Sequence, residues 1–128
     1  MKIRVVSSKD EIPTIGNEEI VHMAFRPSNK DIFTLVKTCP GLKGIHIPTS
    51  YISTISKSTL MFLEMRNIAL LEGDVWGHRK DINEYYEIKT QIIDRINELK
   101  KEGKSKEEII SELEMETRLS KDLIGFLE

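Results

Sequence analysis

The chain has 128 residues, of which 39% are hydrophobic and 31% charged, and its formal net charge is −2. These values indicate one folded domain, or a small domain with a helical appendage, and exclude a disordered chain. The near-neutral charge gives no general attraction to nucleic acids, and the single Cys39 excludes an internal disulfide and a multi-cysteine zinc site. With no apolar run of membrane-spanning length and no signal-peptide pattern at Met1–Arg4, we expect a cytoplasmic protein without a membrane partner.

The first part of the chain repeats one unit, in which an apolar run leads into a polar turn and then a helix start. The predicted strands are Lys2–Val6, Ile20–Phe25, Leu42–Ile47 and Ile68–Leu71. Helices are predicted between them: a short turn after Ser8, a helix capped by Ser28, and a long helix from about Thr49 to Asn67. The units after the first repeat about every 24 residues. This pattern predicts a small parallel sheet of Rossmann-like type, with a leucine-rich-repeat-like solenoid as the minor alternative.

The pattern changes after Arg79, and the segment from Tyr85 to Glu128 reads as helical with no strand candidate. One predicted helix contains Ile88, Ile92, Ile96 and Leu99 and ends at Gly103. A short helix capped by Ser105 follows, and then a last helix from about Thr117. This order resembles a helix-turn-helix module with Glu116–Leu127 as the candidate recognition helix. We therefore predict a parallel α/β domain over residues 1–82 and a helix-turn-helix-like tail over residues 83–128.

Polar side chains follow each predicted strand, and parallel strands bring such turns to one edge of the sheet. Ligands bind at that edge in open α/β folds, and helix N-termini there suit phosphate or carboxylate groups. The candidate ligand-binding residues are Arg26, Ser28, Asn29, Thr49, Ser50, Asp74, Trp76, His78 and Arg79. The alternative for Ser28 and Ser50 is that they only cap their helices.

The segment from Asp74 to Arg79 has the densest chemistry in the chain. Trp76 can stack on a ring, and Arg79 can hold a phosphate. No nucleophile elbow, P-loop or zinc-protease motif is present, so we assign no catalytic residue and expect no cofactor. The alternative is an enzyme acting on a phosphorylated or nucleotide substrate, with Asp74 and His78 as acid and base. His22, His46 and His78 lie in or after three different strands, but a strand histidine is usually structural, and we predict no metal site.

Phosphate contacts of the tail are predicted at Lys104, Lys106, Arg118 and Lys121. Residues 86–128 hold eight Lys or Arg against eleven Asp or Glu, so the segment has a net charge of −3. Since phosphate contacts supply most nonspecific DNA affinity, such a tail binds DNA only if its basic residues cluster on one face. Two interpretations stay open: contact with double-stranded DNA by a homodimer, or a helical docking module.

Three segments resemble a small family from methanogenic archaea that is known as a domain of unknown function. They are Val21–Asn29, Ile47–Tyr51 and Gly73–Tyr85, and the resemblance extends over essentially the whole chain. It implies an archaeal cytoplasmic protein and no particular activity or catalytic residue. Our leading hypothesis is a regulatory protein whose strand-end rim senses a small anionic ligand or a partner, while the tail contacts DNA or pairs subunits. A non-enzymatic interaction adaptor is a further alternative.

Overall fold

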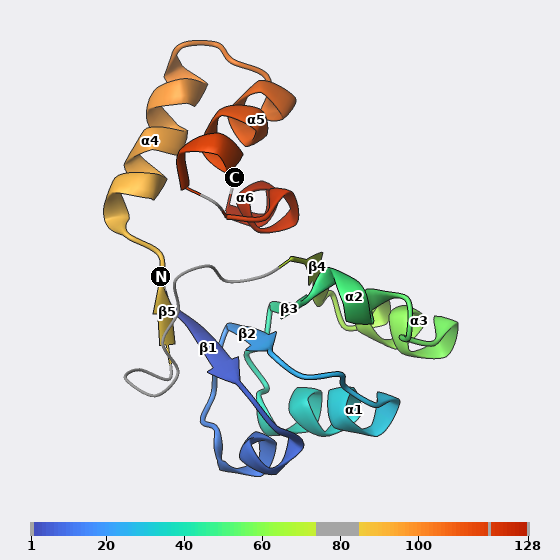
Figure 1. Ribbon diagram of the computed structural model, residues 1–128. Helices are drawn as coiled ribbons and strands as arrows, with labels where there is room; N and C mark the ends of the chain where they lie inside the picture. Colours follow the sequence, from blue (N-terminus) through green and yellow to red (C-terminus); the bar gives the residue numbers. More distant parts are fainter. Residues whose placement is uncertain (1, 74–84, 118, 128) are drawn as a thin grey trace.

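The computed structural model describes residues 2–73, 85–117 and 119–127. Within these ranges five strands form one sheet with the order β4-β3-β2-β1-β5. The strands are β1 (Lys2–Val6), β2 (Ile20–Met23), β3 (Gly44–Ile47), β4 (Ala69–Glu72) and β5 (Tyr85–Glu87). Neighbouring strands from β1 to β4 are parallel, and β5 is antiparallel to β1. The predicted α/β class and the first four strands are confirmed (Figure 1).

The connections between the parallel strands all cover one face of this sheet. They contain a 3₁₀ helix η1 (Lys9–Thr14) and the helices α1 (Asn29–Thr38), α2 (Thr49–Ile52) and α3 (Lys57–Met65). The strand order is sequential, and right-handed crossovers in a sequential order lie on the same side of a sheet. Their core includes Val21, Met23, Ile45, Ile47, Ile32, Leu35 and Leu63. The order therefore differs from the doubly wound order of Rossmann sheets, in which crossovers cover both faces.

The opposite face of the sheet is covered by the C-terminal helices α4 (Thr90–Lys101), α5 (Lys106–Thr117) and α6 (Lys121–Leu127). The sheet contributes Ile3, Ile20 and Leu71 to a second core. The helices contribute Ile96, Leu99, Ile109, Leu113, Leu123 and Ile124. Figure 1 shows the resulting arrangement, with the tail helices on one side of the sheet and α1–α3 on the other. The tail thus completes the burial of the sheet.

One prediction for the tail was wrong, because the segment from Tyr85 is not entirely helical. Residues Tyr85–Glu87 form β5, in which Tyr86 lies opposite Ile3 of β1. A strand of three residues is too short to show an alternating pattern, although two of its residues are tyrosines, which favour strands. The sheet therefore extends beyond residue 82, and the boundary at 82/83 stays a prediction.

The helix predicted from Thr49 to Asn67 is in fact two helices, α2 and α3. The Thr54 hydroxyl donates a hydrogen bond to the Tyr51 carbonyl, 2.6 Å away, at the end of α2. Ser56 then caps α3 by accepting the Thr59 N–H. Hydroxyl side chains that bond to the local backbone compete with a continuous helix, which explains the break.

The candidate recognition helix also begins later than predicted. Glu116 and Thr117 end α5, and α6 begins at Lys121. The Thr117 hydroxyl donates to the Leu113 carbonyl at 2.6 Å and accepts the Leu119 N–H at 3.3 Å. The chain thus leaves the helix at Thr117, and α6 has only seven residues.

No helix within the described ranges is long and apolar enough to cross a membrane.

Candidate functional site

The carboxyl ends of the four parallel strands meet at one edge of the sheet, and a pocket of about 650 Å³ lies there between η1 and α1. Its charged lining residues are Lys9, Asp10, Arg26, Lys30 and Asp31. Neither Arg26 nor the two lysines form an ion pair within the described part of the chain. This rim pocket therefore holds three cations whose charge is available to an anion.

Ser28 also lines the rim pocket, but its side chain has a local partner. The Ser28 Oγ accepts the Asp31 N–H at 3.1 Å, and the Asp31 carboxylate accepts the Ser28 N–H at 2.9 Å. This reciprocal capping box satisfies two of the donors at the start of α1. The capping interpretation thus accounts for Ser28, whereas it leaves Arg26 unexplained.

The other candidate rim residues do not line this pocket. The Asn29 Oδ1 accepts hydrogen bonds from the Thr59 hydroxyl at 2.8 Å and the Ser56 hydroxyl at 3.3 Å, which ties α1 to α3. Thr49 and Ser50 are exposed in the first turn of α2. Arg26 and Ser28 both line the rim pocket, whereas Asn29, Thr49 and Ser50 do not. The remaining predicted residues, Asp74, Trp76, His78 and Arg79, lie outside the described residues.

A buried chain of polar side chains joins the sheet to the tail. His22 of β2 and His46 of β3 are neighbours in register, and their Nδ1 atoms are 2.7 Å apart. The Nε2 of His46 lies 3.0 Å from the Ser120 Oγ, just before α6. Only 2% of His22 and 0% of His46 is exposed, and polar groups buried to this degree are stabilised by such hydrogen bonds. We interpreted His22 and His46 as structural residues and did not predict that they contact each other, although their 24-residue spacing equals the strand repeat.

A second hydrogen bond ties α6 to the edge of the sheet. The Asp122 carboxylate accepts the N–H of Glu72 in the edge strand β4 at 2.8 Å. The N–H groups of Ala69 and Gly73 bond to the strand β3 side, so the Glu72 N–H points outward from the sheet. Asp122 thus takes the place that a further strand would take. Native proteins commonly cover the unpaired backbone N–H groups of an edge strand with a neighbouring helix or loop.

The sheet and the start of α6 approach each other at Gly73, which has a φ of +145°. A Cβ atom at this glycine would lie 2.3 Å from the Ser120 Cβ and 3.1 Å from the His46 Nε2. Real Cβ atoms essentially never lie within 3.0 Å of a neighbouring atom. In addition, residues other than glycine rarely adopt a φ of this positive value. A glycine is therefore required where β4 ends against the tail.

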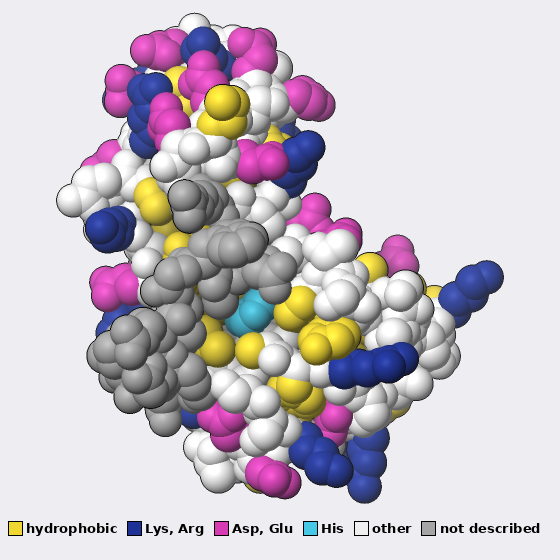
Figure 2. All heavy atoms as spheres, viewed as in Figure 1, with side chains coloured by type: hydrophobic (Ala, Val, Ile, Leu, Met, Phe, Trp, Pro, Cys, Tyr) yellow, Lys and Arg dark blue, Asp and Glu magenta, His cyan; other side chains and the backbone are white. Residues whose placement is uncertain are grey.

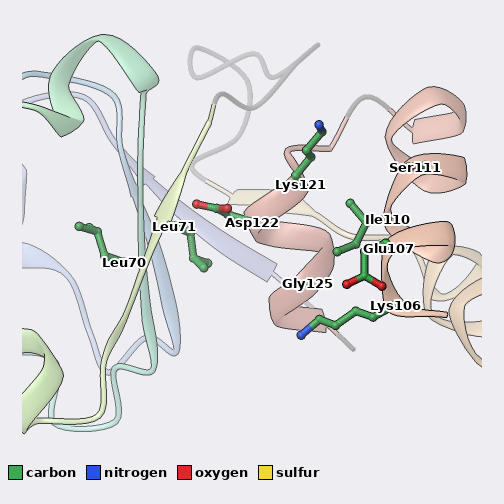
Figure 3. Close-up of a pocket in the computed structure, with 9 residues that line it drawn as sticks. All are labelled: Leu70, Leu71, Lys106, Glu107, Ile110, Ser111, Lys121, Asp122 and Gly125. Carbon is green, nitrogen blue, oxygen red and sulfur yellow. The ribbon is translucent and has the colours of Figure 1, made fainter.

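A groove of about 640 Å³ lies beside this junction, between β4, α5 and α6. Figure 3 shows the Leu71 side chain directed towards α6 and the Leu70 side chain directed away from it. Lys106 and Lys121 line the groove together with the acidic Glu107 and Asp122. The groove brings together two of the predicted phosphate-binding lysines, but next to two carboxylates.

Two of the predicted phosphate-binding lysines lie beside carboxylates in the described part of the tail. The Lys104 Nζ lies 3.1 Å from Glu112, whose carboxylate raises the pKa of Lys104, and the Lys121 Nζ lies 3.8 Å from Glu114. Lys106 forms no ion pair within the described residues, and Arg118 lies outside them. On the face seen in Figure 2, acidic and basic side chains are interspersed over the tail. The tail therefore has the helix order of a DNA-binding fold, and on the face shown in Figure 2 its described basic side chains are mixed with acidic ones.

Comparison with known families matches both parts of the chain. Residues 2–84 match the N-terminal domain of a family of unknown function, DUF1699, and residues 91–127 match the C-terminal HTH domain of the same family. No curated protein and no solved structure matches the chain. The second match confirms the prediction of a helix-turn-helix-like tail, whereas the archaeal origin stays a prediction. Since the two matches together extend over most of its length, the chain belongs to the DUF1699 family.

Proposed function

We propose that this protein is a DNA-binding regulator whose α/β domain holds the helix-turn-helix tail in a weakly binding position and releases it on binding a ligand. The observation that carries this proposal is the attachment of α6 to the sheet through Ser120 and Asp122. In DNA-binding helix-turn-helix proteins, the helix in this third position enters the major groove. The family assignment of the tail as an HTH domain supports the same function.

The docked α6 offers little surface to DNA. Leu123 and Ile124 are buried, the last three residues of α6 are half-buried, and only Lys121 and Asp122 are exposed. The Lys121 ammonium lies near Glu114, and the Asp122 carboxylate is bonded to β4. A recognition helix must insert into a groove about 12 Å wide, and here α5 and the sheet edge flank it. Release of α6 from the sheet would uncover the helix and separate Asp122 from Glu72.

The rim pocket at Arg26 is the proposed sensor of a small anion. Lys9, Arg26 and Lys30 converge on it, and an anion bound there would contact η1 and α1. The predicted residues Asp74, Trp76, His78 and Arg79, which lie outside the described residues, stay in the proposal as candidate ligand-binding residues. An enzyme using Asp74 and His78 stays the alternative, and a homodimer in the cytoplasm stays the expected state of the protein.

The proposal is tested by measuring DNA binding with α6 docked and with α6 displaced. The purified protein is incubated with a randomised duplex DNA pool, the retained DNA is sequenced, and affinity for it is measured by fluorescence anisotropy. Gly73→Ala introduces a Cβ against Ser120, so we expect it to bind DNA more tightly than the wild type. Gly16→Ala is the matched control, because its Cβ would meet no atom within 4 Å.

Two further variants test the proposal without relying on the Cβ atom added by Gly73→Ala. Ser120→Ala removes the contact with His46 and the hydrogen bond accepted from the Leu123 N–H without adding atoms, and we expect it to raise DNA affinity as well. Lys106→Ala, introduced together with Gly73→Ala, should weaken binding to DNA of every sequence. It should also reduce the slope of log affinity against log salt concentration by about 1. Circular dichroism verifies that each variant is folded. If folded wild-type, Gly73→Ala and Ser120→Ala proteins all retain no DNA, the tail is a docking module and the proposal is wrong.

A further inference from the structure

Helix α3 lies on the surface, yet it is apolar on two faces. Thr59 and Leu63 are buried on the side of the core, whereas Leu60, Met61 and Met65 on the other side are 40%, 62% and 81% exposed. A surface helix normally has a single apolar face. Next to these residues, Phe33 of α1 is 37% exposed and packs edge-on against Phe62 of α3, with ring centroids 4.7 Å apart. We call the exposed residues Phe33, Leu60, Met61 and Met65 the α3 face.

Two opposite charges flank the centre of the α3 face. Lys57 is the first residue of α3 and Glu64 lies seven positions later, which is about two helical turns, so both are on the exposed side. Neither residue forms an ion pair within the described part of the chain. A two-fold axis between Leu60 and Met61 would place Lys57 of each chain opposite Glu64 of the other. The surface is therefore complementary in charge to a second copy of itself.

We propose that the α3 face is a homodimer interface, in which α3 packs antiparallel to α3 of a second copy. Leu60 and Met61 form the apolar centre of this interface, and the two Lys57–Glu64 pairs form its polar rim. Methionine side chains adapt readily to an opposing surface, which suits a contact between two identical helices. The charged pairs fix the antiparallel alignment, because a parallel alignment would place like charges opposite each other.

This interface is compatible with an accessible tail. Figure 1 places α3 at the end of the α1–α3 layer, away from α4–α6. A dimer formed through α3 therefore leaves the tail helices uncovered. The inference does not depend on DNA binding, and its test contains no DNA, so the two proposals succeed or fail separately.

The test is the molar mass of the full chain in solution, measured by sedimentation equilibrium over a range of concentrations. Lys57→Glu alone and Glu64→Lys alone each place like charges opposite each other at both ends of the interface. We expect each variant to dissociate with a Kd at least about tenfold higher than that of the wild type. Both substitutions are compatible with the helix, since acids near its start and bases near its end are favourable.

Mixing the two single variants gives the sharpest result. In the mixture, each introduced acid faces a lysine and each introduced base faces a glutamate, so we expect a heterodimer of near wild-type affinity. Met61→Glu places a charge in the apolar centre and should give a monomer. Met115→Glu is the matched control: Met115 is 88% exposed on α5, outside the α3 face, and its substitution should leave the mass unchanged.

Three outcomes would overturn the inference. The first is a wild-type chain that stays monomeric at the highest concentration. The second is a dimer that persists unchanged in Met61→Glu. The third is a pair of charge variants that dimerise as well as the wild type, or that fail to form a heterodimer when mixed.

Discussion

His22 and His46 face each other across β2 and β3 with their Nδ1 atoms 2.7 Å apart, and the opposite nitrogen of His46 reaches Ser120. A hydrogen bond between two imidazole nitrogens requires a proton on one and a lone pair on the other. Each ring thereby restricts the tautomer of its neighbour. Because Ser120 also accepts the Leu123 N–H, the chain of contacts extends from the middle of the sheet to the first turn of α6.

The contributions of His22 and His46 to the stability of the protein should be coupled, because their rings contact each other. His46→Leu removes the contacts with His22 and Ser120, and we expect the free energy of unfolding to fall by about 1–3 kcal/mol. In the double variant His22→Leu/His46→Leu two apolar side chains face each other, so its loss should be smaller than the sum of the two single losses. Urea denaturation of the three variants measures this coupling. Additive losses would show that the two rings do not stabilise each other.

Gly73→Ala should destabilise the junction between the sheet and the tail. The added Cβ overlaps Ser120, and the residue has a φ of +145°, so we expect a loss of about 2 kcal/mol or more. Displacement of α6 also separates Asp122 from Glu72, and hydrogen exchange at the Glu72 amide should become faster. Gly16→Ala should change the stability by less than about 0.5 kcal/mol. Equal exchange at Glu72 in both variants would contradict the described junction.

The capping and ligand-binding interpretations of the rim serines can be separated by two substitutions. Ser28 caps α1 through the Asp31 N–H, so Ser28→Ala should lower the free energy of unfolding by about 1 kcal/mol. Ser50 is exposed in α2 and forms no cap hydrogen bond, so Ser50→Ala should have an effect below about 0.5 kcal/mol. Thermal or chemical denaturation compares them. A Ser28→Ala protein as stable as Ser50→Ala would show that the capping box contributes nothing.

The thiol of Cys39 should be unreactive in the folded protein. Only 1% of the residue is exposed, its Sγ donates a hydrogen bond to the Gly16 carbonyl at 3.1 Å, and burial raises its pKa. A raised pKa means less thiolate at a given pH, and the thiolate is the reactive form. At pH 8 the thiol should therefore react with a disulfide reagent slowly when folded and rapidly in denaturant. Equal rates in the two conditions would place Cys39 at the surface.

The sequence was sufficient for those parts of the fold that depend on local patterns. The four parallel strands follow from apolar runs, and α1 follows from the capping box of Ser28 and Asp31. Strand β5 was missed because it is defined by pairing with β1, more than 80 residues away in the chain. The docking of α6 likewise depends on contacts such as that between His46 and Ser120, which are 74 positions apart. Contacts between residues so far apart in the chain leave no signal in the local periodicity of the sequence.

The candidate site was predictable to a similar extent. Arg26 and Ser28 share a pocket because they follow a strand end, which the parallel order predicts. Asn29 departs from that expectation because its amide oxygen accepts hydrogen bonds from Ser56 and Thr59 of a neighbouring helix. The histidine pair was within reach of sequence reasoning, since two residues one strand repeat apart occupy equivalent register positions on adjacent strands.

The sequential strand order restricts how this protein can change during evolution. Since the crossover helices leave one face of the sheet to the tail, Leu123 and Ile124 belong to a core that the sheet and the tail helices share. A tail transferred to another α/β domain would lose its contacts with this sheet, so the two parts of the chain cannot be exchanged independently. Within the seven residues of α6, only Lys121 and Asp122 are exposed, which leaves the helix few positions at which a new binding preference can arise without disturbing the sheet.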